Sequence, residues 1–130
     1  YLESIDDLPV QPGIILLSGV LSYLPQFEQV LKRIVRLAPD LIIIDRQALA
    51  PEEDACGSWW LQHEESYYGT PLSYPIQLIL KSQLLVLMDG YECMESWCND
   101  FDAAVPDHQG FLFAKKTLLE GAISDTLENN

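Results

Sequence analysis

The chain has 130 residues and a formal net charge of −13, and 48% of its residues are hydrophobic. This length suits a single domain with a buried core. The acidic charge argues against nucleic acid and anionic membrane surfaces as partners, because phosphate groups are neutralised by Lys and Arg.

The first predicted elements form a βαβ unit near the start of the chain. An unbroken apolar run at residues 14–17 predicts a strand buried on both faces, and Ser18 and Gly19 follow it. Apolar residues at helical spacing predict an amphipathic helix over residues 27–37, and a second, β-branched strand follows at residues 41–44. This order predicts parallel strands with a right-handed crossover. Ligands bind outside the carboxyl ends of such strands, so the turn at Ser18 and Gly19 is the first candidate site.

The middle of the chain is predicted to be an irregular segment followed by a helix. Residues 50–70 contain prolines, glycines, acidic residues and several aromatic side chains. This segment is either a lid or pocket wall, or a loop that its own aromatic residues anchor to the body. Pro75 suits the first turn of a helix, and the helix predicted from there to Leu87 is apolar on more than one side. Such a helix is buried or lies against a neighbouring chain.

The two ends of the chain complete the predicted elements. A short edge strand is expected at residues 1–5, and two further strands are expected at residues 91–97 and 110–114, on either side of a polar loop. We expect residues 120–130 to form a flexible tail. The chain opens at Tyr1 rather than Met, so we expect it to be a piece of a longer polypeptide.

The cysteines argue against a disulfide framework or a zinc site. Cys56, Cys93 and Cys98 are odd in number and unevenly spaced, and they match no standard zinc motif. The sequence also contains no apolar run of bilayer length and no signal-peptide pattern. We therefore expect free thiols in a cytoplasmic protein that binds no metal.

The sequence contains no familiar catalytic motif. Neither a glycine-rich phosphate loop nor a Gly-x-Ser-x-Gly elbow occurs. A Ser-His-Asp set would have to be assembled from Ser18, His63 and Asp45, but such triples arise by chance and are recognised by geometry. A serine hydrolase is therefore one alternative function, and a non-catalytic α/β interaction or dimerisation module is another.

Several segments, in their order and spacing, carry a resemblance to a known family: Ser18–Leu24, Ile42–Arg46, Gln62, Ser73–Pro75 and Asp89–Tyr91. On these segments the chain resembles the C-terminal half of a class I S-adenosylmethionine-dependent methyltransferase. More narrowly, it is similar to a methyltransferase family associated with surface-polysaccharide and sugar-related functions. The resemblance covers residues 1–116.

The resemblance implies an α/β fold built on part of a Rossmann-like sheet, with helices packed on the sheet. Residues 14–17 would be the fourth strand of that sheet and residues 41–44 the fifth. Residues 110–114 would be the seventh strand, inserted antiparallel between the fifth and the sixth, at residues 91–97. The family's glycine-rich cofactor loop belongs to the half of the fold that precedes Tyr1. The isolated chain, as a fragment or a degenerate relative, is therefore expected to be inactive.

The resemblance also implies a cofactor site and an acceptor site. Ser18, Gly19 and Val20 would border the methionine end of S-adenosylmethionine. Arg46 would hold a carboxylate or phosphate of a small-molecule acceptor through its planar guanidinium, and His63 would act as a base. The residues implied on the acceptor side are Tyr23, Arg46, Gln62, His63 and Tyr74.

Two of these residues have plainer explanations that the sequence leaves open. Arg46 could simply pair with Asp45 or Glu52, and His63 could be an ordinary surface residue. Neither explanation requires a ligand.

The predicted partners are a small-molecule acceptor and further copies of the chain. The fourth strand, at residues 14–17, would normally pair with a strand outside this sequence, and an unpaired apolar edge is a template for another chain. The helix expected at residues 76–87 adds apolar surface. We therefore expect a homodimer or larger assembly that uses one or both of these elements.

Overall fold

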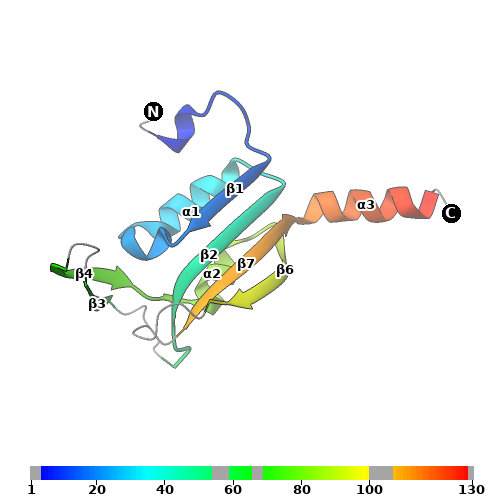
Figure 1. The fold of residues 1–130 in the computed structure, drawn as a ribbon. Coiled ribbons are helices and arrows are strands. Elements are labelled where there is room, and N and C mark those ends of the chain that lie inside the picture. Colours follow the sequence, from blue (N-terminus) through cyan, green and yellow to red (C-terminus); the bar gives the residue numbers. More distant parts are fainter. Residues whose placement is uncertain (1–3, 54–58, 66–68, 100–106, 129–130) are drawn as a thin grey trace.

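The computed structural model describes residues 4–53, 59–65, 69–99 and 107–128, and their centre is a five-stranded sheet (Figure 1). Its strands are β1 (Ile14–Ser18), β2 (Leu41–Ala50), β5 (Ile79–Leu80), β6 (Tyr91–Cys98) and β7 (His108–Lys115). Four of them follow one another in the order β1-β2-β7-β6, and the short β5 pairs with β2.

The strand directions match those of the expected fold. β1 and β2 are parallel, in register from Ile14 opposite Leu41 to Ser18 opposite Asp45. β7 lies between β2 and β6 and is antiparallel to both of them. The predicted α/β fold and its βαβ unit are therefore confirmed, and so is the antiparallel insertion that the resemblance implied.

Helix α1 (Phe27–Arg36) connects β1 to β2 and covers one face of the sheet. It buries Phe27, Leu31 and Ile34, which lie on the face that the helical period predicted. Removing one such side chain from water contributes about 1.5–3 kcal/mol. The residues that join these three in the main core include Ile42, Ile44, Leu84, Phe111 and Phe113.

The prediction of a helix starting at Pro75 is wrong for the first part of the segment. Residues Pro71–Gln77 form strand β4, β5 follows, and helix α2 extends only over Lys81–Leu87. Burial along β4 has a period of two, because Ile76 is buried while Pro75 is exposed. Pro75 lies opposite Leu61 in a two-stranded hairpin, where a missing backbone N–H is tolerated. The apolar run after Pro75 therefore supplies two short strands before it reaches the helix.

The segment expected to be irregular contains regular structure in its described parts. β2 continues to Ala50, and Trp59–Glu65 form strand β3, which pairs antiparallel with β4. This β3–β4 hairpin extends from the body beside α1 (Figure 1). The remaining residues of the segment, 54–58 and 66–68, lie outside the described residues.

At the two ends of the chain the structure contains helical elements that were not predicted. Ile5–Asp7 form a short 3-10 helix, η1, where an edge strand was predicted, and residues 1–3 lie outside the description. Helix α3 (Lys116–Glu128) follows β7 directly. A helix at this position does not test whether residues 120–130 are flexible, so that expectation stays a prediction. Among the described residues, no helix has both the length and the apolar character to cross a bilayer.

Candidate functional site

The candidate site begins at the carboxyl end of β1, where Ser18 pairs with Asp45 of β2. β2 was predicted to end at this level but continues to Ala50. The turn predicted from Ser18 and Gly19 lies at the carboxyl end of β1, and the backbone N–H of Gly19 donates to the carbonyl of Asp45 at 2.8 Å. Gly19 has φ +61°, a left-handed conformation that glycine adopts without strain. The turn therefore needs glycine for its backbone conformation.

Arg46 interrupts β2 at the same level. Its φ is +55°, which costs an L-residue about 1–2 kcal/mol. The pairing of β2 with β7 shifts register between Ile44 and Gln47, on either side of it. The Arg46 side chain is 60% exposed, and its Nε lies 3.9 Å from Oδ2 of Asp45. Ala38, after the end of α1, is the other described non-glycine residue with positive φ, at +51°. Such residues are enriched at functional sites, which makes Arg46 a candidate site residue.

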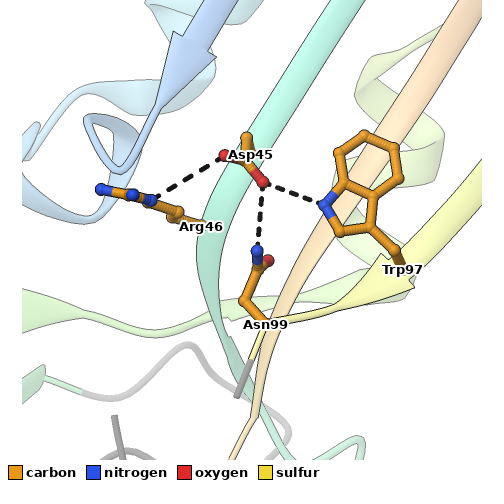
Figure 2. A network of polar contacts seen from close by, with 4 residues as sticks. All are labelled: Asp45, Arg46, Trp97 and Asn99. Carbon is orange, nitrogen blue, oxygen red and sulfur yellow. Dashed lines mark hydrogen bonds and ion pairs between the residues drawn. The ribbon is translucent and has the colours of Figure 1, made fainter. Parts of the chain in front are cut away.

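Asp45 is the centre of a polar network at this end of the sheet (Figure 2). Its Oδ1 accepts hydrogen bonds from Nε1 of Trp97 at 3.0 Å and from Nδ2 of Asn99 at 3.3 Å. Both donors come from the end of β6 and reach across β7. Asp45 therefore connects Arg46 on one side to the far edge of the sheet on the other.

The indole ring of Trp97 reaches Asp45 because β7 has a glycine in its path. A Cβ added to the buried Gly110 would overlap three atoms of that ring, far inside van der Waals contact. Gly110 stands opposite Trp97 in the β6–β7 register. No local sequence pattern identifies Trp97, Asn99 or Gly110 as site residues, since their contacts depend on the antiparallel register of β6 and β7.

A second buried contact attaches the segment after Gly19 to β2. Leu21–Tyr23 form the 3-10 helix η2. The side-chain amide of Gln47 is 1% exposed and donates from Nε2 to Oγ of Ser22 at 3.0 Å and to the carbonyl of Ala48 at 2.9 Å. This bond fixes η2 beside the site, and Gln47 and Ser22 were also missed in the sequence.

The structure brings three of the predicted acceptor-side residues together. The rings of Tyr23 in η2 and Tyr74 in β4 have centroids 5.8 Å apart and are tilted by 52°. Gln62 is opposite Tyr74 in the hairpin and is buried. These contacts place the inner face of the hairpin against η2, next to the turn that holds Ser18 and Val20.

His63 belongs to the other face of the hairpin. Neighbouring residues of a strand point to opposite faces, so its exposed ring points away from the side of Gln62. Nδ1 of His63 lies 2.8 Å from Oγ of Ser73. The structure therefore does not bring His63 to the other predicted acceptor residues. It also does not assemble Ser18, His63 and Asp45 into a hydrolytic triad.

The plainer explanation of Arg46 holds for one of its two candidate partners. Asp45 lies within ion-pair distance of Arg46, whereas the carboxylate of Glu52 accepts hydrogen bonds from the backbone N–H of Ser82 at 3.0 Å and its hydroxyl at 2.8 Å. The bond from the backbone of Ser82 lowers the pKa of Glu52 below its usual value. The Glu52 carboxylate therefore accepts hydrogen bonds from the first turn of α2.

The described residues show no arrangement that would hold a metal. Among them, no three His, Cys, Asp or Glu side chains are grouped as metal ligands. Cys93 and Cys98 are exposed free thiols, and Cys56 lies outside the described residues.

Comparison with known proteins identifies the type of fold. No protein-family model matches the sequence, and no curated protein matches it. The chain is similar to the crystal structure of the glycopeptide N-methyltransferase MtfA complexed with (S)-adenosyl-L-methionine, with a TM-score of 0.54 and 12% sequence identity over 83% of this chain and 55% of that chain. For the complex of MtfA with (S)-adenosyl-L-homocysteine, the TM-score is 0.48 at 12% identity, over 79% of this chain and 54% of that chain.

The likeness to the first of these structures confirms a methyltransferase-like α/β fold, and at this identity it shows the fold alone. The chain spans about half the length of that solved structure. The role of each site residue and the acceptor are therefore matters for proposal.

Proposed function

We propose that this chain is the substrate-side part of an S-adenosylmethionine-dependent methyltransferase that acts on a small-molecule or sugar-related acceptor. One observation carries the proposal. The strand order β1-β2-β7-β6, with β7 antiparallel, is combined with left-handed backbone at Gly19, just after the carboxyl end of β1, and at Arg46, which lies next to Gly19 within β2. In open α/β sheets, ligands bind at this edge.

The residues at the end of β1 fit one end of the cofactor. Ser18 and Val20 are exposed on either side of the half-buried Gly19, and the hydroxyl of Ser18 would suit the polar methionine end. When bound, the cofactor supplies a methyl group on a sulfonium centre, and displacement there depends on alignment of the acceptor and exclusion of water. A site without a strong acid or base is consistent with that chemistry.

The neighbouring residues suit the acceptor. The exposed guanidinium of Arg46, with its Nε 3.9 Å from the Asp45 carboxylate, would hold a carboxylate or phosphate in bidentate fashion. The rings of Tyr23 and Tyr74, which lie against each other, would supply an aromatic surface for the rest of the acceptor. His63 has no part in this arrangement, because its ring is engaged with Ser73 on the outer face of the hairpin.

The test is cofactor binding by calorimetry, with the 130-residue chain and with the protein encoded by the complete reading frame. The resemblance places the glycine-rich loop before Tyr1, so we expect the chain alone to bind S-adenosylmethionine weakly or not at all. We expect the complete protein to bind it with micromolar affinity. Failure of the complete protein to bind the cofactor would overturn the proposal, and tight binding by the chain alone would contradict the role of the missing loop.

A matched pair of variants in the complete protein locates the site. Ser18→Tyr fills the turn at the end of β1 and should weaken cofactor binding by about tenfold or more, equivalent to about 1.4 kcal/mol. Ser124→Tyr makes the same chemical change at an exposed position of α3 and should leave the affinity unchanged. Equal affinities for the two variants would remove Ser18 from the cofactor site.

A further inference from the structure

The hydrogen bonds to the Asp45 side chain use one of its two carboxylate oxygens. Oδ1 accepts from Trp97 and from Asn99, whereas Oδ2 faces Nε of Arg46 at 3.9 Å (Figure 2). A hydrogen bond between two such charged groups is about 2.7–2.9 Å long, so this ion pair contains none. Within the part of the chain that the structure describes, Oδ2 therefore accepts no hydrogen bond. The side chain of Asp45 is 26% exposed and that of Arg46 is 60% exposed, so a ligand can reach both.

Trp97 and Asn99 hold this carboxylate in one orientation. The indole N–H of Trp97 can only donate, so it requires an acceptor at Oδ1, and the Asn99 amide adds a second donor to the same oxygen. Oδ2 is consequently directed toward Arg46 (Figure 2). Arg46 in turn lies beside the turn after β1, because a Cβ on Gly19 would be 3.8 Å from Cβ of Arg46. The carboxylate oxygen without a hydrogen bond therefore lies at the proposed acceptor site.

The two opposite charges at this site select among ligands. Arg46 alone would bind any carboxylate or phosphate through its guanidinium. With Oδ2 of Asp45 close by, an anion on Arg46 meets a like charge, and the cost is larger for a phosphate, which carries about −1.5 to −2 at pH 7, than for a carboxylate. A hydroxyl or amine beside the anion replaces this repulsion by a hydrogen bond to Oδ2. Sites built to bond a ligand's hydroxyl or amine reject the analogue that lacks it, because the protein's polar group is then left unpaired.

We propose that Asp45 sets the specificity of the acceptor site, and that Oδ2 of Asp45 and the guanidinium of Arg46 together bind a carboxylate with a hydroxyl or amine on the adjacent carbon. The two protein groups are only 3.9 Å apart, so the two ligand groups must be neighbours within the ligand. A hydroxy acid or an amino acid, free or as part of a larger acceptor, has this arrangement. The inference rests on the proposed function in taking this ligand as the methyl acceptor, whereas the binding is measured without methyl transfer.

The experiment is an NMR titration of the 130-residue chain, with the indole N–H signals as the readout. Three matched carboxylates serve as probes: L-lactate has a hydroxyl beside the carboxylate, L-alanine has an ammonium there, and propionate has neither. The chain contains 3 Trp residues, and Trp97→Phe identifies the signal of the indole that is bonded to Asp45. The signals of Trp59 and Trp60, in the β3–β4 hairpin, are internal references.

A matched pair of variants tests the role of Asp45. In Asp45→Asn the amide oxygen can replace Oδ1 as the acceptor for Trp97 and Asn99. The amide nitrogen then takes the place of Oδ2, so that an acceptor becomes a donor while the network is kept. The control, Asp40→Asn, makes the same change at an exposed position just before the other end of β2. Thermal melts followed by circular dichroism establish that both variants are folded.

We expect the wild type to bind lactate, alanine or both about fivefold more tightly than propionate, with a shift of the Trp97 signal, which is the effect of one hydrogen bond. A stronger response to lactate supports the proposal with a hydroxyl as the donor, and a stronger response to alanine supports it with an amine. Asp45→Asn should lose the preference, because its amide can donate to propionate, and Asp40→Asn should keep it.

Equal binding of the three probes by the wild type, or no binding of any of them, would overturn the proposal. A preference that survives in Asp45→Asn would overturn it as well. These outcomes are independent of the cofactor. If the complete protein fails to bind S-adenosylmethionine while the preference for lactate or alanine holds, the proposed methyl transfer is wrong and the binding role of Asp45 stands.

Discussion

The contact between Gly110 and Trp97 allows a test of how the site is built. Gly110→Ala adds one methyl group to a buried position of β7, and that group would overlap the Trp97 indole. Neither the backbone of Gly110 nor its φ forbids alanine, since this glycine has no positive φ. The expected effect therefore comes from the displaced ring alone.

The expected loss in free energy of unfolding follows from the interactions that the displaced Trp97 ring gives up. Moving Trp97 breaks its 3.0 Å hydrogen bond to the Asp45 carboxylate, a loss of about 1.5 kcal/mol at a half-buried position. Displacing a packed side chain costs a further 1–3 kcal/mol or so, and alanine recovers about 0.5–1 kcal/mol over glycine in a strand. We expect a net loss of about 2 kcal/mol, which lowers Tm by roughly 5–10 °C for a domain of this size.

The assay is urea denaturation of Gly110→Ala followed by circular dichroism, with Gly13→Ala as the control. A Cβ at Gly13 would meet nothing within 4 Å, so that variant should be neutral. A double-mutant cycle with Trp97→Ala isolates the cause, because alanine at position 110 should cost little once the indole is gone. If Gly110→Ala is as stable as Gly13→Ala, or equally destabilising with and without Trp97, the reasoning is refuted.

Three further predictions use the same structure. Tyr91→Phe removes a hydrogen bond of 2.6 Å from the Tyr91 hydroxyl to the carbonyl of Pro39 and should lower the free energy of unfolding by about 1 kcal/mol. Burial, together with the charge of Asp40, raises the pKa of Tyr91. In urea titrations the wild type should therefore lose this contribution to stability as pH rises above about 10, whereas the variant should not. Glu52→Gln should be less stable than the wild type at neutral pH, and the difference should disappear as pH falls below about 4.5 and through the lowered pKa of Glu52, which denaturation at two pH values measures. If the proposed methyl transfer is correct, Arg46→Lys should leave Tm unchanged, since its ion pair with Asp45 is exposed, and should raise the KM of an anionic acceptor about tenfold; an unchanged KM removes Arg46 from the acceptor site.

The sequence predicted the elements whose signals are local. The apolar run of β1 and the periodic face of α1 are visible within a few residues, and the strand and the helix were both confirmed. The predicted burial of β1 on both faces is wrong, because Ile14 and Leu16 are 61% and 62% exposed. The error over residues 71–80 has the opposite origin. Pro75 followed by apolar residues is a valid helix start, and only pairing with β3 makes it a strand. Local propensity was overridden there by a partner that is distant in the sequence.

The site residues also divide into those with a local sequence signal and those whose contacts depend on distant parts of the chain. Ser18, Gly19 and Arg46 were predicted because they follow short apolar runs, and the structure places them close together. Ser18 and Gly19 lie at the carboxyl end of β1, whereas Arg46 lies within β2, which continues to Ala50. Trp97 and Asn99 were missed because they reach Asp45 only through the register of two other strands. His63 was predicted from its chemistry alone, and the alternation of β3 turns it away from the inner face of the hairpin.

The left-handed backbone at Arg46 links these observations. It costs about 1–2 kcal/mol and interrupts the β2–β7 ladder, so it persists only if the residues on both sides are held firmly. Asp45 is held by the Gly19 amide and by Trp97 and Asn99, while the buried Gln47 is bonded to Ser22. All of these contacts converge on one exposed guanidinium at the edge where ligands bind. A fold that only maximised stability would continue β2 straight through this position, and the strain is therefore consistent with the acceptor-binding role that we propose for Arg46.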